Sequence, residues 1–230
     1  MDVQFLSQPL ASSDAVLSDD EKELGVCLVD IGGGTTDLAV WTQGAIRHTS
    51  VIPIAGDQIT NDIAMALRTP TREAEDIKCK YGCALSQLAD VHQNIDVAGV
   101  DDRPSRSLSR RALADVIQPR VEELYELIQN ELRRAGFEEV LSSGIVLTGG
   151  ASVMPGMVEL GEEIFHMPVR LGNPKYQGSL ADVVQSPHFS TSFGLLLEAQ
   201  AQRKRGQKIQ EKQGIKDVFS SMKDWFVKNF

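Results

Sequence analysis

The sequence has few features of secreted, membrane-spanning or metal-dependent proteins. Its 3 cysteines are an odd number and suggest no disulfide framework, which favours a reducing cytoplasm. It has no run of about 18 apolar residues, so no bilayer-spanning helix is expected. Residues 1–5 lack the charged and apolar regions of a secretory signal. No nucleophile motif lies near any of the 4 histidines, and we assign no catalytic residue.

Charge is distributed unevenly along the chain. The net charge is −9, yet from Arg203 onward eight basic residues face three acidic ones. The part before Arg203 is therefore strongly acidic, which argues against nucleic acid as its partner. The basic end of the chain needs an explanation of its own.

Hydrophobic patterning predicts an α/β protein with a mixed sheet flanked by helices. Residues 24–31, 35–41 and 45–54 have the composition of strands, and tight turns between them indicate a meander. Thr71 is expected to cap a helix that ends near Tyr81, and Pro119 is expected to kink or divide a helix over 108–135. The other expected elements are an acidic loop at 18–21, a helix after Gly56, a loop over 89–107 with one short strand near 95–97, a strand at 144–148, a helix over 155–165, an edge strand at 169–171 and a final helix over 193–201.

Two glycine clusters follow predicted strands and indicate a phosphate site. Glycine lets backbone amides approach phosphate oxygens closely, and clustered amides form an anion-binding concavity. The candidate ligands of the first cluster are Gly32, Gly33, Gly34, Thr35 and Thr36. Asp30, at the end of the strand, could hold a phosphate-bound Mg²⁺ through water. The alternative is a glycine-rich hairpin turn with a solvated Asp30.

The second cluster comprises Gly149, Gly150 and Ala151, where a strand leads into a helix. Bare backbone near a helix N-terminus suits a nucleotide, although an ordinary strand-to-helix turn gives the same pattern. Together the two clusters, about 115 residues apart, are more specific than either alone.

These motifs resemble those of the actin, sugar-kinase and heat-shock-chaperone ATPase superfamily. The first cluster is similar to its second phosphate loop, and residues 145–151 are similar to its adenosine motif. The resemblance implies that Glu75 and Lys78 face the ribose and adenine; a solvated pair on one helix is the alternative. Within the superfamily the chain resembles the bacterial cell-division FtsA family through residues 28–37, 51–56, 77–84 and 117–120.

The FtsA resemblance implies an actin-like, ribonuclease H-like second domain. Residues 1–55 and 140–200 would form subdomain 2A, and residues 56–139 a helix-rich subdomain 2B. The superfamily's first phosphate loop would lie in an N-terminal half that this chain lacks. ATP and Mg²⁺ are therefore expected to bind weakly or not at all to this chain alone, with at most weak ATPase activity.

The end of the chain predicts a membrane-binding amphipathic helix. Residues 201–214 are expected to be a flexible linker, and residues 215–230 a helix with basic flanks. Its apolar face comprises Ile215, Val218, Phe219, Met222, Trp225, Phe226 and Phe230. Docking of this helix on the body or on a partner protein is the alternative.

The family resemblance also implies partners. FtsA proteins anchor the FtsZ ring to the cytoplasmic face of the inner membrane at the division site, help to recruit later division proteins and self-associate into actin-like polymers. Arg120 and Glu123 would contact the FtsZ C-terminal tail, or else form an ordinary intrahelical pair. The alternatives for the whole chain are a soluble actin-like ATPase or a pilus-assembly scaffold.

Overall fold

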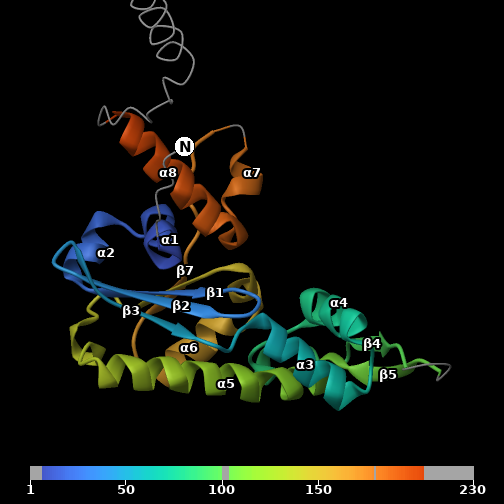
Figure 1. The fold of residues 1–230 in the computed structure, drawn as a ribbon. Helices are drawn as coiled ribbons and strands as arrows, with labels where there is room; N and C mark the ends of the chain where they lie inside the picture. Colours follow the sequence, from blue (N-terminus) through green and yellow to red (C-terminus); the bar gives the residue numbers. More distant parts are fainter. Residues whose placement is uncertain (1–6, 100–103, 179, 205–230) are drawn as a thin grey trace, which may run out of the picture.

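A computed structural model describes residues 7–99, 104–178 and 180–204 of the chain. Figure 1 shows a central twisted sheet with helices on both faces and a second group of elements extending from one end. The main sheet has the order β3-β2-β1-β6-β7, and β4 pairs with β5 in a separate two-stranded sheet. The strands are β1 (Val26–Ile31), β2 (Thr36–Thr42), β3 (Ala45–Ile52), β4 (Asn94–Val97), β5 (Arg106–Ser109), β6 (Ile145–Thr148) and β7 (Val169–Leu171).

The sheet is mixed, as predicted. β1, β2 and β3 form an antiparallel meander, whereas β6 joins β1 in parallel and β7 joins β6 in parallel. The helices are α1 (Gln8–Val16), α2 (Asp19–Leu24), α3 (Gly56–Leu67), α4 (Thr71–Tyr81), α5 (Arg110–Arg134), α6 (Met157–Phe165), α7 (Ala181–Val184) and α8 (Ser190–Lys204). The 3-10 helices are η1 (Ser86–Leu88), η2 (Glu138–Val140), η3 (Gly150–Val153) and η4 (Pro187–Phe189).

Alternating side chains of β1 enter two hydrophobic clusters, one on each face of the sheet. Cys27, Val29 and Ile31 belong to the large cluster formed with α3, α5 and α6. Val26 and Leu28 belong to the smaller cluster on the α1 side. Because both faces of β1 are covered, the strand is apolar over most of its length, as expected of a central strand.

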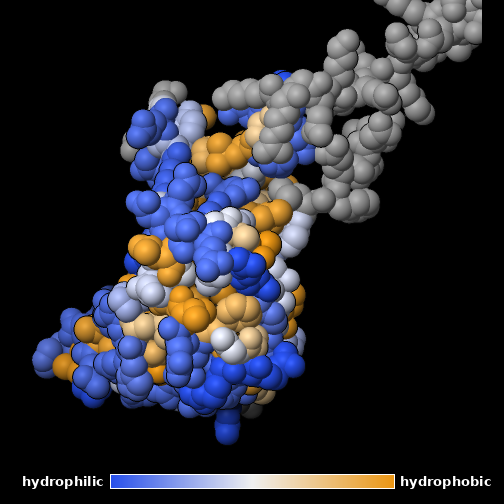
Figure 2. Space-filling view, turned by 90° about the vertical axis from the view of Figure 1, so that its left-hand side faces the viewer, coloured by the Kyte–Doolittle hydropathy of each residue, from blue (hydrophilic) through white to orange (hydrophobic). Residues whose placement is uncertain are grey.

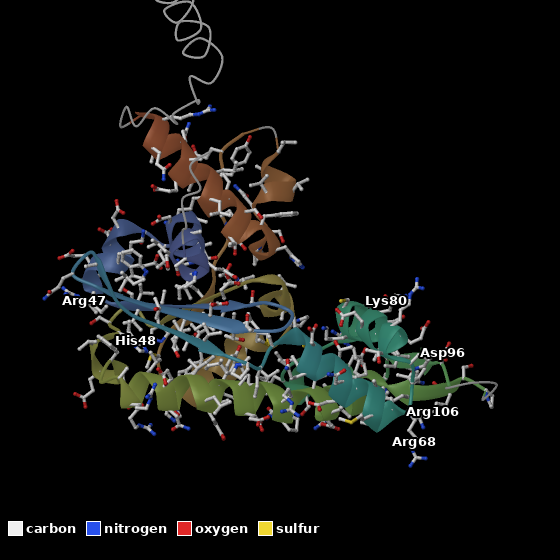
Figure 3. All side chains as sticks on the ribbon, viewed as in Figure 1. Arg47, His48, Arg68, Lys80, Asp96 and Arg106 are labelled. Atoms are coloured by element: carbon white, nitrogen blue, oxygen red, sulfur yellow. The ribbon has the colours of Figure 1, made fainter. Side chains whose placement is uncertain are left out.

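The large cluster continues from the sheet into the group formed by α3, α4, β4 and β5. Ile95 of β4 and Ile63 of α3 share this core with Leu147 of β6. At the other end, His48 of β3 lies above α5, and its Nε2 is 2.9 Å from Glu131 Oε1 (Figure 3). The predicted division into subdomains stays a prediction.

The predicted acidic loop at 18–21 is wrong, because this segment begins helix α2. Ser18 and Glu21 form a capping box, in which each side chain bonds to the backbone N–H of the other residue. Acidic side chains in the first turn of a helix also interact favourably with its dipole. The polar, acidic composition of this segment predicts a loop, although Ser18 and Glu21 have the spacing of a capping box.

Three further expectations differ from the structure in detail. The predicted division at Pro119 is wrong, because the buried Ile117 and Val121 on either side pack into the same core and the chain forms one helix there; the predicted kink stays a prediction. Residues 106–109 form strand β5, where the end of the loop over 89–107 and the start of the helix over 108–135 were predicted. The side chain of Thr71 does not cap α4, since Pro70 occupies the cap position.

Helix α8 begins before the predicted position 193 and extends through Lys204, so the first four residues of the predicted linker are helical. In the part that the structure describes, no helix is both long and apolar enough to cross a membrane. The face of the molecule shown in Figure 2, at the left-hand end of Figure 1, is largely hydrophilic with smaller apolar areas between.

Candidate functional site

Both glycine clusters lie at the same edge of the main sheet. β1 and β6 are parallel neighbours, with Asp30 opposite Thr148, so the residues that follow them emerge side by side. We call residues 32–35 the first glycine turn and residues 149–151 the second. The carboxyl ends of adjacent parallel strands are where ligands bind in open α/β sheets.

The first glycine turn is tight and exposed. Gly32 N donates to Thr35 O at 3.0 Å and closes the turn. Gly33 and Gly34 are exposed, so their amides are open to a ligand. The start of α3 is hydrogen-bonded to the turn, because Asp57 N donates to Gly33 O at 2.8 Å.

The two threonines of this motif have different surroundings. Thr35 is exposed, and its hydroxyl donates to Asp37 Oδ2 over a long 3.4 Å. Thr36 is fully buried, and its hydroxyl donates to Ile54 O at 2.7 Å. Thr36 therefore fixes the turn to the chain that enters α3, and Thr35 is the better placed of the two for a phosphate.

The second glycine turn passes very close to the end of β1, directly before the first glycine turn. Gly149 has φ of 87°, and a Cβ on it would lie 2.5 Å from Ile31 O and against Asp30 Oδ1. No larger residue permits this approach. Gly150 lies beside the ring of His188, and Ala151 faces Gly56 at the start of α3.

Asp30 is 3% exposed and is not the solvated carboxylate of the hairpin alternative. Its Oδ2 accepts a hydrogen bond of 2.6 Å from Ser12 of α1 and one of 3.2 Å from Thr191 of α8. Neither hydroxyl was predicted to belong to the site. No sequence signal marks them, because they reach Asp30 only through packing of α1 and α8 on the sheet.

Lys78 and Glu75 of α4 lie near the first glycine turn. Lys78 is 8% exposed, and its Nζ donates to Gly56 O at 3.0 Å and to Thr60 Oγ1 at 2.8 Å. Glu75 Oε2 is 2.7 Å from Lys78 Nζ. Burial acts to raise the pKa of Glu75, but hydrogen bonds from Lys78 and Thr60 outweigh burial and the pKa is lowered. Lys78 is thus built into the contact between α3 and α4, whereas the Glu75 side chain stays about half-exposed, at 46%.

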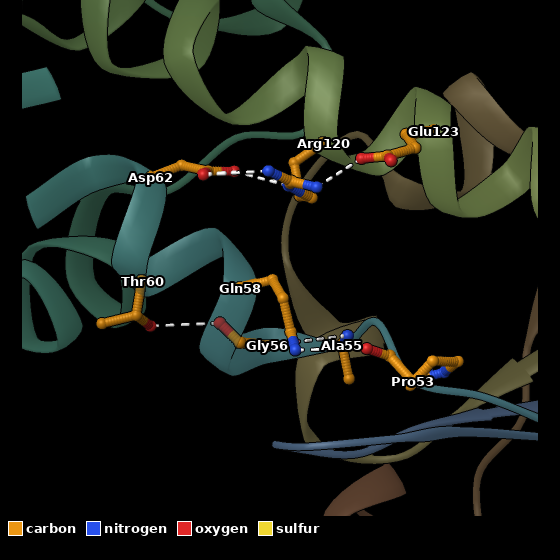
Figure 4. Close-up of polar contacts among 8 residues, drawn as sticks. All are labelled: Pro53, Ala55, Gly56, Gln58, Thr60, Asp62, Arg120 and Glu123. Carbon is orange, nitrogen blue, oxygen red and sulfur yellow. Dashed lines mark hydrogen bonds and ion pairs between the residues drawn. The ribbon is translucent and has the colours of Figure 1, made fainter. Parts of the chain in front are cut away.

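A pocket of about 480 Å³ opens between α3 and α4 beside Glu75. Its lining is Asp57, Thr60, Asn61, Thr71, Arg72, Glu75 and Asp76. Carboxylate, hydroxyl and amide groups of this kind can accept and donate hydrogen bonds to a sugar or base. The sequence predicted Glu75 at this position but not the lining residues that α3 contributes. Figure 4 shows the start of α3 at Gly56, after its N-cap Ala55.

The residues fit a nucleotide better than a metal ion alone. The backbone amides of the exposed Gly33 and Gly34 suit phosphate oxygens, whereas the Lys78 ammonium already contacts Gly56 O, Thr60 and Glu75. Within the described ranges no group of three or more His, Cys, Asp or Glu side chains could hold a metal.

Burial and the neighbouring Asp30 charge raise the pKa of Asp37, an effect only partly offset by Thr35. A divalent cation near Asp30 would need phosphate and water oxygens to complete its coordination.

Arg120 of α5, predicted to contact a partner, is engaged inside the chain (Figure 4). Its guanidinium donates to both carboxylate oxygens of Asp62 on α3, at 2.6 and 3.0 Å, and also pairs with Glu123. Such a bidentate pair joins two helices with defined geometry. A peptide that recruits Arg120 would have to compete with Asp62. The role of Arg120 and Glu123 in partner binding stays a prediction.

The predicted membrane-binding residues lie outside the described residues. They are Ile215, Val218, Phe219, Met222, Trp225, Phe226 and Phe230. The proposed linker beyond Lys204 lies outside them as well.

The fold belongs to the actin-like class, as solved structures of that class show. MreB5 of Spiroplasma citri bound to ADP superimposes with a TM-score of 0.71 over 88% of this chain and 61% of that chain, at 18% identity. The MamK double helical filament gives a TM-score of 0.63 over 84% of this chain and 58% of that chain, at 17% identity. At such identities the likeness concerns the fold alone.

The chain is a member of the FtsA family, since the family model "Cell division protein FtsA" matches residues 27–194. Cell division protein FtsA of Pseudomonas aeruginosa is 63% identical over 193 residues, which cover 84% of this chain and 46% of that protein. The Neisseria meningitidis protein of the same name is 48% identical, over 99% of this chain and 56% of that protein. The chain thus spans about half the length of the curated relatives it matches.

Proposed function

We propose that this chain is the nucleotide-binding and membrane-tethering part of a division adaptor that anchors FtsZ filaments to the cytoplasmic face of the inner membrane at the division site. The observation that carries the proposal is the meeting of both glycine turns, Asp30 and the Lys78–Glu75 pair at one edge of an actin-like sheet. Membership of a cell-division family supports the biological role.

ATP would act in this adaptor as a ligand for structure and polymerisation. The first glycine turn would hold phosphate oxygens, and the pocket between α3 and α4 would take the ribose and base. Bound Mg²⁺ would neutralise phosphate charge, with Asp30 close to it. No described side chain is assigned as a base for an attacking water, so at most weak ATPase activity is proposed.

The membrane contact is assigned to residues 215–230. Their apolar side chains recur at helical spacing, with lysines on the opposite face. Full burial of a large apolar side chain contributes about 1.5–3 kcal/mol, so partial burial of several is enough for reversible attachment. Basic residues would add attraction to anionic lipids.

The protein partners follow from the family and the fold. The C-terminal tail of FtsZ is proposed to bind at the helices between Pro70 and Ala135, which include α4 and α5, near Arg120 and Glu123. Likeness to a filament-forming protein supports self-association into actin-like polymers. Later division proteins are proposed as further partners.

Co-flotation with anionic liposomes tests the tethering function directly. The whole chain is compared with a variant that ends at Gln213, and both are checked for folding by circular dichroism. We expect flotation of the whole chain and its loss on truncation. Equal behaviour of the two chains would mean that the terminal segment docks on protein, and it would favour a soluble actin-like ATPase or a pilus-assembly scaffold.

A further inference from the structure

The first two residues of α8 contact the ends of both strands that carry the glycine turns. Ser190 Oγ lies 2.6 Å from Thr148 Oγ1, at the end of β6. Thr191 donates to the carboxylate of Asp30, near the end of β1. One helix thus touches both strand ends from the α1 side of the sheet.

The carboxylate of Asp30 depends on these contacts because it is withdrawn from water. Ser12 is fully buried and supplies the shorter hydrogen bond, at 2.6 Å. A buried carboxylate needs donors that replace its hydration. Ser12 and Thr191 are such donors, and they come from helices at opposite ends of the described chain.

Thr191 has two acceptors within reach of its single proton. Asp30 Oδ2 lies 3.2 Å from Thr191 Oγ1, and Ser12 Oγ lies 2.9 Å from it. A hydroxyl can donate to one acceptor at a time. If Asp30 turns toward a cation above the first glycine turn, Thr191 can donate to Ser12 instead. Such a change in Asp30 would therefore leave Thr191 with a hydrogen-bond acceptor.

We propose that Ser12 and Thr191 are positioning residues for Asp30, and that through them the start of α8 responds when Mg²⁺-bound phosphate groups occupy the glycine turns. This inference rests on the nucleotide binding proposed above. Helix α8 ends at Lys204 and precedes the proposed membrane segment, residues 215–230, in sequence.

Because this chain alone is expected to bind ATP weakly or not at all, the test uses a reconstituted full-length protein in which an N-terminal half completes the cleft. It measures the affinity of this protein for the ATP analogue AMPPNP, in Mg²⁺ and in EDTA, by titration calorimetry. Thr191→Val removes the hydroxyl at almost constant volume, Thr191→Ser keeps it, and Ser192→Ala changes the exposed neighbour. A hydrogen bond to a charged group predicts that the gain in affinity from Mg²⁺ falls about tenfold in Thr191→Val. Thr191→Ser is expected to restore most of this gain, and Ser192→Ala to leave it unchanged.

Amide hydrogen exchange supplies a readout that a purely structural role would not move. In the reconstituted wild-type protein, Mg²⁺ and AMPPNP together are expected to slow exchange in the first turns of α8 as well as in the first glycine turn. In Thr191→Val the protection of α8 is expected to disappear while exchange in α5 stays unchanged. If Thr191→Val does not fold, Ser12→Ala takes its place in both measurements.

The outcomes separate this inference from the proposed function. Absence of any AMPPNP binding by the reconstituted wild-type protein would overturn the nucleotide assignment and the inference together. Binding that gains from Mg²⁺ equally in wild type and Thr191→Val, with the same protection of α8, would overturn the inference and leave the nucleotide site standing.

Discussion

Gly149 shows how a single residue can be required for two separate reasons. Its φ of 87° lies in the left-handed region, and a Cβ would collide with Ile31 O. Side chains other than glycine cost about 1–2 kcal/mol in that region, before any collision. We expect Gly149→Ala to lower the free energy of unfolding by about 3–5 kcal/mol, measured by urea denaturation.

Gly136 provides the matched control for this prediction. Its φ is 77°, and a Cβ there would meet nothing within 4 Å. Gly136→Ala should therefore cost only the conformational part, about 1–2 kcal/mol. Equal losses in the free energy of unfolding for Gly149→Ala and Gly136→Ala would contradict the close approach of Gly149 to Ile31 at the end of β1.

Gly33 tests the first glycine turn as a phosphate site. It is exposed, and a Cβ would face the Asp57 carboxylate at 3.3 Å. Gly33→Val would place a branched side chain where phosphate oxygens approach the amides. In a reconstituted full-length protein, we expect ATP affinity to fall about tenfold or more, the equivalent of about 1.4 kcal/mol or more, in a fluorescent-nucleotide titration.

Thr35→Val is the companion variant, since it removes a hydroxyl from the same turn and leaves the amides free. A smaller effect than that of Gly33→Val is expected. Unchanged affinity in Gly33→Val, with unfolding also unchanged, would exclude the turn from the nucleotide site.

Local sequence predicted which glycines gather at the site, but it misjudged some of the neighbouring side chains. Thr35 and Thr36 are indistinguishable in the motif, yet Thr36 is buried against Ile54. Their roles differ because the alternation of β2 and the path of the chain before α3 decide which hydroxyl faces inward. Lys78 and Glu75 pair with each other, and Lys78 contacts Gly56 at the start of α3; their role toward a nucleotide stays a prediction.

At the scale of elements, α2 is joined to the far edge of the sheet by an ion pair. Arg170 of β7 donates to both carboxylate oxygens of Glu21, at 2.7 and 2.8 Å. Burial acts to raise the pKa of Glu21, but Arg170 and Ser18 outweigh burial and lower it to about 2. Because the pKa of Glu21 is lower in the folded chain than its ordinary value of 4.5, the ionised carboxylate stabilises the fold at pH values above 4.5. This stabilisation is lost as the pH falls from 4.5 toward 2.

Glu21→Gln should therefore lower the free energy of unfolding at pH 7 by about 1–2 kcal/mol, a value reduced for the partial exposure of Arg170. The difference in the free energy of unfolding between Glu21→Gln and wild type should become smaller below pH 4.5. Urea denaturation at several pH values measures this difference. Glu23→Gln on the same helix is the control, and a pH-independent difference for Glu21→Gln would rule out the charge as its cause.

Helix boundaries could be predicted where capping residues, glycine or proline mark them in the sequence. They were harder to predict where packing of buried side chains determines how far a helix extends. The positions of α3 and α6 follow from periodicity and flanking glycine or proline, whereas the continuity of α5 depends on its buried stripe. Arg120 reads as one member of an intrahelical pair, but its main partner Asp62 lies 58 residues away on α3. No local pattern announces such a contact.

At the scale of the whole molecule, an acidic body is linked to a basic, apolar end segment. An anionic membrane repels the body, so attachment should depend on residues 215–230. Replacing Trp225 and Phe226 by serine removes two large apolar side chains, each worth about 1.5–3 kcal/mol when fully buried. We expect liposome flotation to be lost in this double variant without any change in thermal unfolding.

Ser220→Ala, on the polar face of the same predicted helix, should float like the wild-type chain. Retained flotation of the Trp225 and Phe226 double variant would refute the membrane assignment. Raising the salt concentration should weaken flotation of the wild-type chain, because basic residues contribute part of the attraction.

The sequence alone determined the strands around each glycine turn, the mixed α/β class and the family. These follow from patterns within a few residues, such as turn glycines and apolar periodicity, that local sterics and burial impose. Tertiary structure decided which hydroxyl groups surround Asp30 and which carboxylates pair with Arg120 and Arg170. Ser12 and Thr191 are 179 residues apart and meet only because α1 and α8 pack on the same face of the sheet. Contacts of that kind depend on how distant elements cross, which no local pattern records.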